Sequence, residues 1–223
     1  MKLQVTFSKR DMSFHPSFDT LLTMDTGAAK VQAVLEGSLP GVYENDKLTQ
    51  LRMGAFAQCG NLTAVRLPNC TRLGMSRQFY ECQNITEIHL PQLREIEDAT
   101  YCFYGVSKLK RICLPELTTI TTGFSGTFWG CEMVERIEFP KLSGTTIQTF
   151  AFRNCRRLHT LVLGGATLNP LENTNAFNGA GTTSAVGLRI FVPDNLVQAY
   201  KTAGGWSSFA NKIKPISELE EEA

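Results

Sequence analysis

The chain has 223 residues, with 22 basic and 21 acidic side chains and 43% hydrophobic residues. This composition excludes a disordered or fibrous chain and is typical of one globular domain or two small ones. The near-zero net charge lacks the basic excess with which nucleic-acid-binding proteins neutralise phosphates, so we expect no nucleic-acid partner.

Residues 1–47 lack the repeat found later in the chain and are predicted to form an N-terminal β-rich cap. Residues 3–7 alternate apolar and polar side chains as a strand does, and residues 31–35 form a second apolar segment. The alternative is a docking segment that joins a particle or a second copy of the chain. We find no secretory signal, anchor or membrane-spanning run, so we expect an intracellular or virion-associated protein that reaches a cell surface only by another route.

A repeat begins after residue 47 and continues to residue 193. Its unit reads Phe56-x-x-Cys59-x-x-Leu62-x-x-Val65-x-Leu67-Pro68. The later copies keep a phenylalanine at the first position, and the spacing between successive phenylalanines is nearly constant along the chain. We number the coils by these residues, from Phe56 in the first coil to Phe177 in the sixth. A regular period of this kind is typical of solenoids, in which each repeat is one structural unit.

Each unit is predicted to form one short strand followed by a loop or a short helix. A proline, Pro68, directly follows the apolar positions Leu62, Val65 and Leu67. Proline has no backbone N–H to donate to a neighbouring strand, so it suits the end of a short strand. One unit cannot enclose a core, so stacked units must bury their recurring apolar side chains against each other. We expect two buried columns, made by Phe56, Phe79, Phe103, Phe128, Phe152 and Phe177 and by Cys59, Cys82, Cys131 and Cys155.

The return segment of each unit also keeps one apolar residue before the next phenylalanine. The spacing between the two differs from coil to coil, so we expect the length changes to fall in loops on this side of the stack. The residues concerned are Leu51, Leu73, Ile96, Ile120, Ile147 and Leu171.

The unit resembles the BspA-type leucine-rich repeat, through its Leu-x-x-Val-x-Leu-Pro core preceded by Phe-x-x-Cys. This resemblance covers about residues 48 to 217. It implies a leucine-rich-repeat solenoid of about six coils, each of roughly 23–25 residues. The members of this family are bacterial surface proteins and some phage proteins. Val106 and Ala180 depart from the cysteine column, and an insertion follows Ala180.

Residues 194–217 are predicted to form a C-terminal helical cap over the last coil. Pro193-Asp194-Asn195 can begin a short helix, and Trp206, Phe209 and Ile213 supply a second apolar stripe. An acidic tail, residues 218–223, follows the cap.

The cysteines do not indicate a metal site. Zinc ligands usually come in close pairs, whereas these cysteines recur once per coil and their column also accepts valine and alanine. We interpret the column as buried and structural, and we expect no metal or cofactor. Cys113, between Ile112 and Leu114 on an outward strand position, is the best candidate for a reactive thiol.

The outward strand positions read Arg66, His89, Cys113, Glu138, Val162 and Phe191, with no common chemistry. We therefore expect any recognition there to be of one irregular partner surface, with Arg66, His89, Glu138, Val162 and Phe191 as the candidate partner-binding residues. Basic residues gather in coils three to five, where we expect cross-strand pairing of Glu135 with Lys110, of Glu87 with Arg111 and of Glu132 with Arg156.

Three functions remain open. The leading hypothesis is a non-catalytic recognition or adhesion module that binds a protein or a glycan. The alternative is a structural virion protein of a phage or prophage. A cysteine enzyme that uses His89 and Cys113 is a remote third hypothesis, because the pair lacks an orienting third group.

Overall fold

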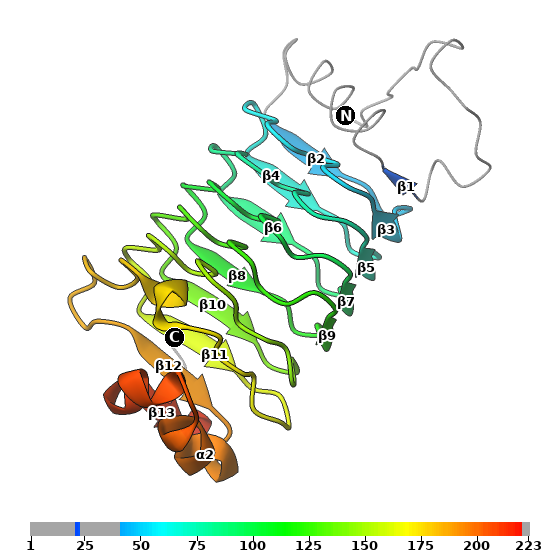
Figure 1. The fold of residues 1–223 in the computed structure, drawn as a ribbon. Helices are drawn as coiled ribbons and strands as arrows, with labels where there is room; N and C mark the ends of the chain where they lie inside the picture. The colour runs from blue at the N-terminus through cyan, green and yellow to red at the C-terminus, as the bar shows by residue number, and fades with distance from the viewer. Residues whose placement is uncertain (1–20, 23–40, 220–223) are drawn as a thin grey trace, which may run out of the picture.

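The computed structural model describes residues 21–22 and 41–219, which form a stack of coils with parallel strands (Figure 1). Each of the six coils adds one strand to a first ladder, which begins with β2 before the first coil and ends with β13 in the C-terminal cap. The ladder consists of a three-stranded group, from β2 to β6, and a five-stranded group, from β8 to β13. Each group is parallel and in register, and β6 lies beside β8. The strands are β2 (Val42–Glu44), β4 (Ala64–Arg66), β6 (Glu87–His89), β8 (Arg111–Cys113), β10 (Arg136–Phe139), β11 (Thr160–Leu163), β12 (Arg189–Val192) and β13 (Ile213–Pro215).

A second parallel ladder runs along the return segments, where loops were predicted. The apolar residues Leu51, Leu73 and Ile96 pair in register from coil to coil because each fills the same place in the core. After Ile120 the pairing moves to Phe124, which bridges to Ile147, so the extra residues of the long fourth return segment are absorbed by a change of register. The strands are β1 (Leu21–Leu22), β3 (Gln50–Leu51), β5 (Arg72–Leu73), β7 (Glu95–Ile96) and β9 (Thr119–Ile120).

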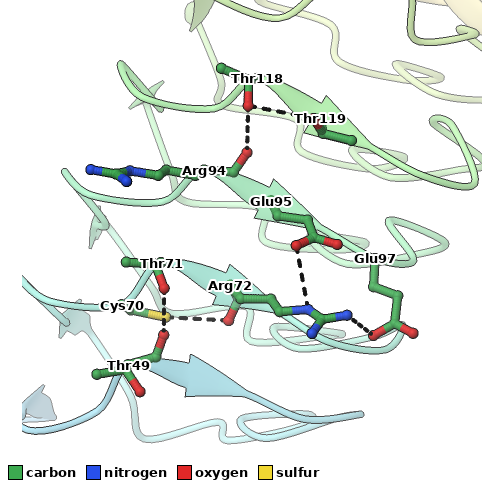
Figure 2. Close-up of polar contacts among 9 residues, drawn as sticks. All are labelled: Thr49, Cys70, Thr71, Arg72, Arg94, Glu95, Glu97, Thr118 and Thr119. Atoms are coloured by element: carbon green, nitrogen blue, oxygen red, sulfur yellow. Dashed lines mark hydrogen bonds and ion pairs between the residues drawn. The ribbon is translucent and has the colours of Figure 1, made fainter.

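The outer surface of the second ladder is joined by polar contacts between coils (Figure 2). The Arg72 guanidinium on β5 lies 3.6 Å from the carboxylate of Glu95 and 3.1 Å from that of Glu97 in the next coil. The Thr71 hydroxyl donates to the carbonyl oxygen of Thr49 at 3.2 Å, and that of Thr118 donates to the carbonyl oxygen of Arg94 at the same distance. These side chains contact groups of the neighbouring coil because equivalent positions of successive coils lie directly above each other.

The turn around each core phenylalanine makes a third set of bonds between coils. The backbone N–H of Phe79 donates to Cys102 O at 2.8 Å, and the N–H groups two residues before and after it donate in the same direction. These bonds give the buried N–H groups of the turn their acceptors, which is why an irregular segment can lie against the core. The residue two places after each core phenylalanine has a positive φ in every coil, namely Gln58, Glu81, Gly105, Gly130, Asn154 and Gly179.

Both predicted columns lie in the core, together with the buried aliphatic side chains of the two ladders. The phenylalanine rings lie nearly parallel, with centroids 5.4 Å apart from Phe79 to Phe103 and 4.9 Å apart from Phe103 to Phe128. Thiols of the cysteine column donate to the backbone of an earlier coil: Cys82 to Phe56 O at 2.7 Å, and Cys131 to Phe103 O at 3.0 Å. The column is therefore apolar and buried, as its exchange with valine indicates, and its thiols also act as weak donors.

The first ladder starts earlier than the predicted boundary at residue 48. Val42–Glu44 occupy a strand position one coil before Ala64–Arg66, and the Tyr43 ring packs against Phe56 with centroids 5.2 Å apart. Leu21–Leu22 likewise extend the second ladder next to Gln50–Leu51. The strands predicted at residues 3–7 and 31–35 lie outside the described residues.

The C-terminal cap combines short helices with a final strand. It contains the 3-10 helix η4 (Asp194–Leu196), the α-helix α2 (Val197–Thr202), the 3-10 helices η5 (Trp206–Lys212) and η6 (Ile216–Glu218), and β13 between the last two. The predicted helical cap is confirmed, and it also contains the strand Ile213–Pro215, which pairs with β12 and so closes the strand ladder. A further 3-10 helix, η3 (Thr174–Phe177), lies in the sixth coil.

Asn169 joins the cap to the stack. Its buried side chain accepts from Thr145 N at 2.9 Å and donates to the Tyr200 hydroxyl at 3.1 Å, while its carbonyl oxygen accepts from the Trp206 indole at 2.7 Å. Each of these polar groups is buried, so the bonds define how the cap fits over the last coil.

Candidate binding surface

The outward side chains of the first ladder form a surface that we call the strand face. It contains two columns, because alternate residues of a strand point to the same side and neighbouring strands are in register. One column passes through Arg66, His89, Cys113 and Glu138, as predicted, and the other passes through Glu87 and Arg111.

The strand face is exposed in its first three coils. Glu87, His89, Arg111 and Cys113 are all exposed, and Arg66 is half-buried. The Arg66 guanidinium makes two bonds of 2.7 Å to the Glu87 carboxylate, which lowers the pKa of that carboxyl. Arg111 and His89 make no side-chain hydrogen bond or ion pair among the described residues, so their polar groups are available to a partner.

The strand face is closed in coils four to six. Val162 is 4% exposed and Phe191 is 2% exposed, so the prediction that these two side chains contact a partner is wrong for this conformation. Val162 lies between Glu138 and Phe191 in the ladder, and the Arg189 guanidinium lies 5.6 Å from the Phe191 ring centroid. Neighbouring strands bring these side chains together, and a reading of one strand at a time does not show this packing.

Glu138 is also restrained. Its carboxylate accepts from the Arg136 guanidinium at 2.7 and 3.1 Å, and Arg136 is itself 8% exposed. Of the five predicted binding residues, the structure therefore leaves Arg66 and His89 together on one open surface and separates them from the other three.

The basic residues of coils three to five are partnered differently from the prediction. Glu87 pairs with Arg66 rather than with Arg111, and Glu135 pairs with Arg157 at 3.6 Å rather than with Lys110. No ion pair between Glu132 and Arg156 occurs in residues 41–219. Both residues instead line an open hollow of about 690 Å³, one wall of which is the insertion of the sixth repeat at Thr183 to Val186.

Cys113 and His89 do not form a catalytic pair. A nucleophilic cysteine needs a lowered pKa, whereas desolvation of the thiol by its neighbours, together with the Glu138 carboxylate, raises the pKa of Cys113. No hydrogen bond joins His89 to Cys113 in the part of the chain that the structure describes. This geometry argues against the cysteine-enzyme hypothesis.

The remaining cysteines are buried and hold their protons. Burial raises the pKa of Cys82 and of Cys131 to about 12 and that of Cys59 and Cys70 to about 11. Across residues 21–22 and 41–219, no group of three or more His, Cys, Asp or Glu side chains is placed to hold a metal ion.

One surface was missed by the sequence analysis. The turns of coils two to five bring together five half-buried aromatic side chains, which we call the aromatic strip: Tyr80, Tyr101, Tyr104, Trp129 and Phe150. The rings of Tyr80 and Tyr104 stack at 4.9 Å, and Trp129 contacts Tyr104 at 5.4 Å and Phe150 at 5.2 Å. The signal was present in the sequence, because Tyr80, Tyr104 and Trp129 each directly follow a core phenylalanine.

Within the described residues, none of the helices is both long enough and apolar enough to cross a membrane.

Comparison with known proteins places the repeats in a family. The model of the BspA-type leucine-rich repeat region matches residues 49–183 in six copies. The comparison with curated proteins gives no match. One similar solved structure is a leucine-rich repeat protein of T. pallidum, which is 19% identical over 74% of this chain and 83% of that chain, with a TM-score of 0.45. Another is a leucine-rich repeat protein of Bacteroides ovatus, which is 17% identical over 79% of this chain and 42% of that chain, with a TM-score of 0.42. The match to the family model covers more than half of the chain, and the protein belongs to the BspA-type leucine-rich repeat family.

Proposed function

We propose that the protein is a non-catalytic recognition module that binds a protein partner through the strand face of its first three coils. Leucine-rich repeat proteins typically mediate protein binding, and their family is generally non-catalytic. The observation that carries the proposal is the contrast along the strand face, which is open with unengaged polar groups at His89 and Arg111 and closed at Val162 and Phe191.

The open part of the strand face has mixed charge. The Arg66 guanidinium lies 3.9 Å from the Glu44 carboxylate and 2.7 Å from that of Glu87, and Arg111 adds a second positive charge on β8. Such a surface suits a partner with an irregular arrangement of both signs, because charge complementarity determines register and excludes wrong partners. A regular glycan would instead favour a repeated residue in this column, and the described strands carry none.

Arg111→Glu combined with His89→Ala tests the strand face. Both side chains are exposed and make no bond among the described residues, so the folded state should be unaffected. The control is Arg94→Glu, which makes the same charge change on an exposed arginine beside the second ladder. A partner isolated by affinity capture on the wild-type chain and then purified should bind the control with its wild-type affinity and the strand-face variant at least about tenfold more weakly.

Equal binding by the wild type and the strand-face variant would contradict the proposed surface. Turnover of a substrate that is abolished by Cys113→Ser would contradict the non-catalytic function itself.

The virion alternative depends on the N-terminal segment as a docking element. Residues 1–20 and 23–40 lie outside the described residues, so the structure lends that alternative no support.

A further inference from the structure

The aromatic strip is separate from the strand face and needs its own explanation. Its five rings come from four successive coils, and they lie on the turns that follow the return segments, whereas the strand face lies on the first ladder. Aromatic and arginine side chains are the residues most enriched at the centres of protein interfaces and among their binding hot spots.

Two arginines belong to the same surface. Arg77 lies 5.6 Å from the ring centroid of Tyr80 and 5.8 Å from that of Tyr101, and Arg153 lies 4.9 Å from Trp129 and 4.7 Å from Phe150. Neither guanidinium has a carboxylate within ion-pair distance among the described residues, and the buried Nε of Arg153 has no hydrogen-bond partner there. The strip therefore presents two cations that are positioned by aromatic rings and lack a counter-charge.

The backbone beneath the strip is held in an uncommon conformation. Tyr101 has a φ of 53° and Phe150 a φ of 65°, in the left-handed region that bulky side chains rarely adopt. The equivalent positions in two other coils are Gly54 and Gly126, which adopt the same conformation without strain. Coils three and five thus carry a large ring where the fold alone would favour glycine, and strain of this kind gathers at functional sites.

The strip is also fitted together locally. A Cβ on Gly126 would collide with the ring of Tyr101, so the glycine of the fourth coil makes room for the tyrosine of the third. This dependence between two coils indicates that the ring positions are specific.

The chemistry of the exposed groups indicates which class of partner would fit the strip. Each of the five rings has a face engaged by a neighbouring ring or by a guanidinium group, which disfavours the stacking of sugar rings. The Tyr80 hydroxyl interacts with the Glu81 carboxylate. The ring edges, the hydroxyls of Tyr101 and Tyr104, the Trp129 N–H and the two guanidinium groups remain for a partner. Planar guanidinium groups stacked on aromatic rings bind carboxylates through paired hydrogen bonds.

We propose that the aromatic strip is a second binding surface, which docks an acidic segment of a protein partner whose carboxylates pair with Arg77 and Arg153 and whose apolar side chains pack on the aromatic rings. This surface acts independently of the strand face.

Selection from a displayed library of random peptides on the immobilised full-length chain tests the proposal. Peptides that carry Asp or Glu next to aromatic or aliphatic residues should be enriched. A synthetic copy of an enriched peptide should change the fluorescence of the chain, and the change should be lost in Trp129→Phe, because the other tryptophan, Trp206, is buried in the cap.

Charge-removing variants locate the binding. In Arg77→Gln with Arg153→Gln the peptide should bind at least about tenfold more weakly, whereas the matched pair Arg156→Gln with Arg157→Gln, outside the strip, should stay within about twofold of the wild type. Binding should also weaken as salt is added. The strand-face variant should bind the peptide normally, so the two proposals fail separately.

Several outcomes would overturn the proposal. These are the absence of enrichment, enrichment without acidic residues, an equal loss of binding in the Arg156 and Arg157 control, and a Trp129 signal given by a linear glucan oligosaccharide but not by the peptides. Thermal unfolding of each variant shows whether it is folded. The Trp129 fluorescence of the wild-type chain tests peptide binding at the strip even if a variant fails to fold.

Discussion

The thiol of Cys82 donates a hydrogen bond of 2.7 Å to the carbonyl oxygen of Phe56, the core phenylalanine of the preceding coil. The same bond recurs from Cys131 to Phe103 and from Cys155 to Phe128, each at 3.0 Å. Each thiol therefore connects the two buried columns of neighbouring coils. Ionisation of such a thiol would place a charge in the core and remove the donor.

We predict that the protein loses stability steeply above pH 9. A cysteine thiol in an unfolded chain has an ordinary pKa of about 9, and burial raises the pKa of Cys82 and of Cys131 to about 12 in the folded state. Above pH 9 the unfolded chain releases protons that the folded chain retains. The stabilisation from each buried thiol is therefore fully present below pH 9. Between pH 9 and about pH 12 the free energy of unfolding falls by about 1.4 kcal/mol per pH unit for each buried thiol. Urea unfolding between pH 7 and 10.5 measures this slope.

Cys82→Val serves as the control for that prediction, because valine already occupies the column at Val106. The variant should show a shallower alkaline slope than the wild type. A wild-type free energy of unfolding that is the same at pH 8 and pH 10 would contradict the prediction.

We predict that Phe103→Ala destabilises the chain by about 3–5 kcal/mol, because it leaves a cavity in the middle of the ring stack. Phe103 is fully buried between Phe79 and Phe128. Phe103→Leu keeps more of the volume and should cost less. Urea denaturation measures both variants, and Tyr104→Ala, at the half-buried neighbouring position, is a control with an expected smaller effect.

Gly126 and Tyr101 should be energetically coupled. Gly126→Ala is expected to cost about 1–3 kcal/mol, because φ is 58° and the added Cβ collides with the Tyr101 ring. In a Tyr101→Ala background only the backbone penalty remains, so the cost should fall by about 1 kcal/mol or more. A double-mutant cycle measured by urea unfolding gives the coupling, and additive effects would contradict the contact.

Asn169→Leu should loosen the C-terminal cap. The change leaves the Thr145 N–H and the Leu142 carbonyl without their partner, at a cost of about 1–3 kcal/mol for each buried group. Trp206 packs beside Tyr200, with ring centroids 5.2 Å apart, so its emission should move to longer wavelength as water enters the cap. Asn178→Leu, at an exposed position of the same coil, is the control, and an unchanged Trp206 spectrum in Asn169→Leu would contradict the role of this side chain.

The repeat, the strand of each coil and both core columns could be predicted from the sequence. A core position that recurs in every coil needs a side chain of similar size each time. The regular spacing of residues such as Phe56, Phe79 and Cys82 is therefore visible in the sequence. The second ladder was missed because its strands are very short, as Gln50–Leu51 and Arg72–Leu73 show, and too short for alternation to appear. The bridge from Phe124 to Ile147 depends on a change of register that spacing alone does not show.

The functional surfaces depended on tertiary structure to a greater degree. The outward direction of Arg66, His89, Val162 and Phe191 follows from the two-residue period of a strand, which the sequence shows. Whether such a side chain is exposed depends on its neighbours across the strands, and Glu138 and Phe191, which flank Val162, belong to the coils before and after it. The sequence by itself therefore determined the solenoid and its core, because repetition constrains size and spacing, whereas only the stacking of coils decided which strand positions are open and which aromatic rings meet.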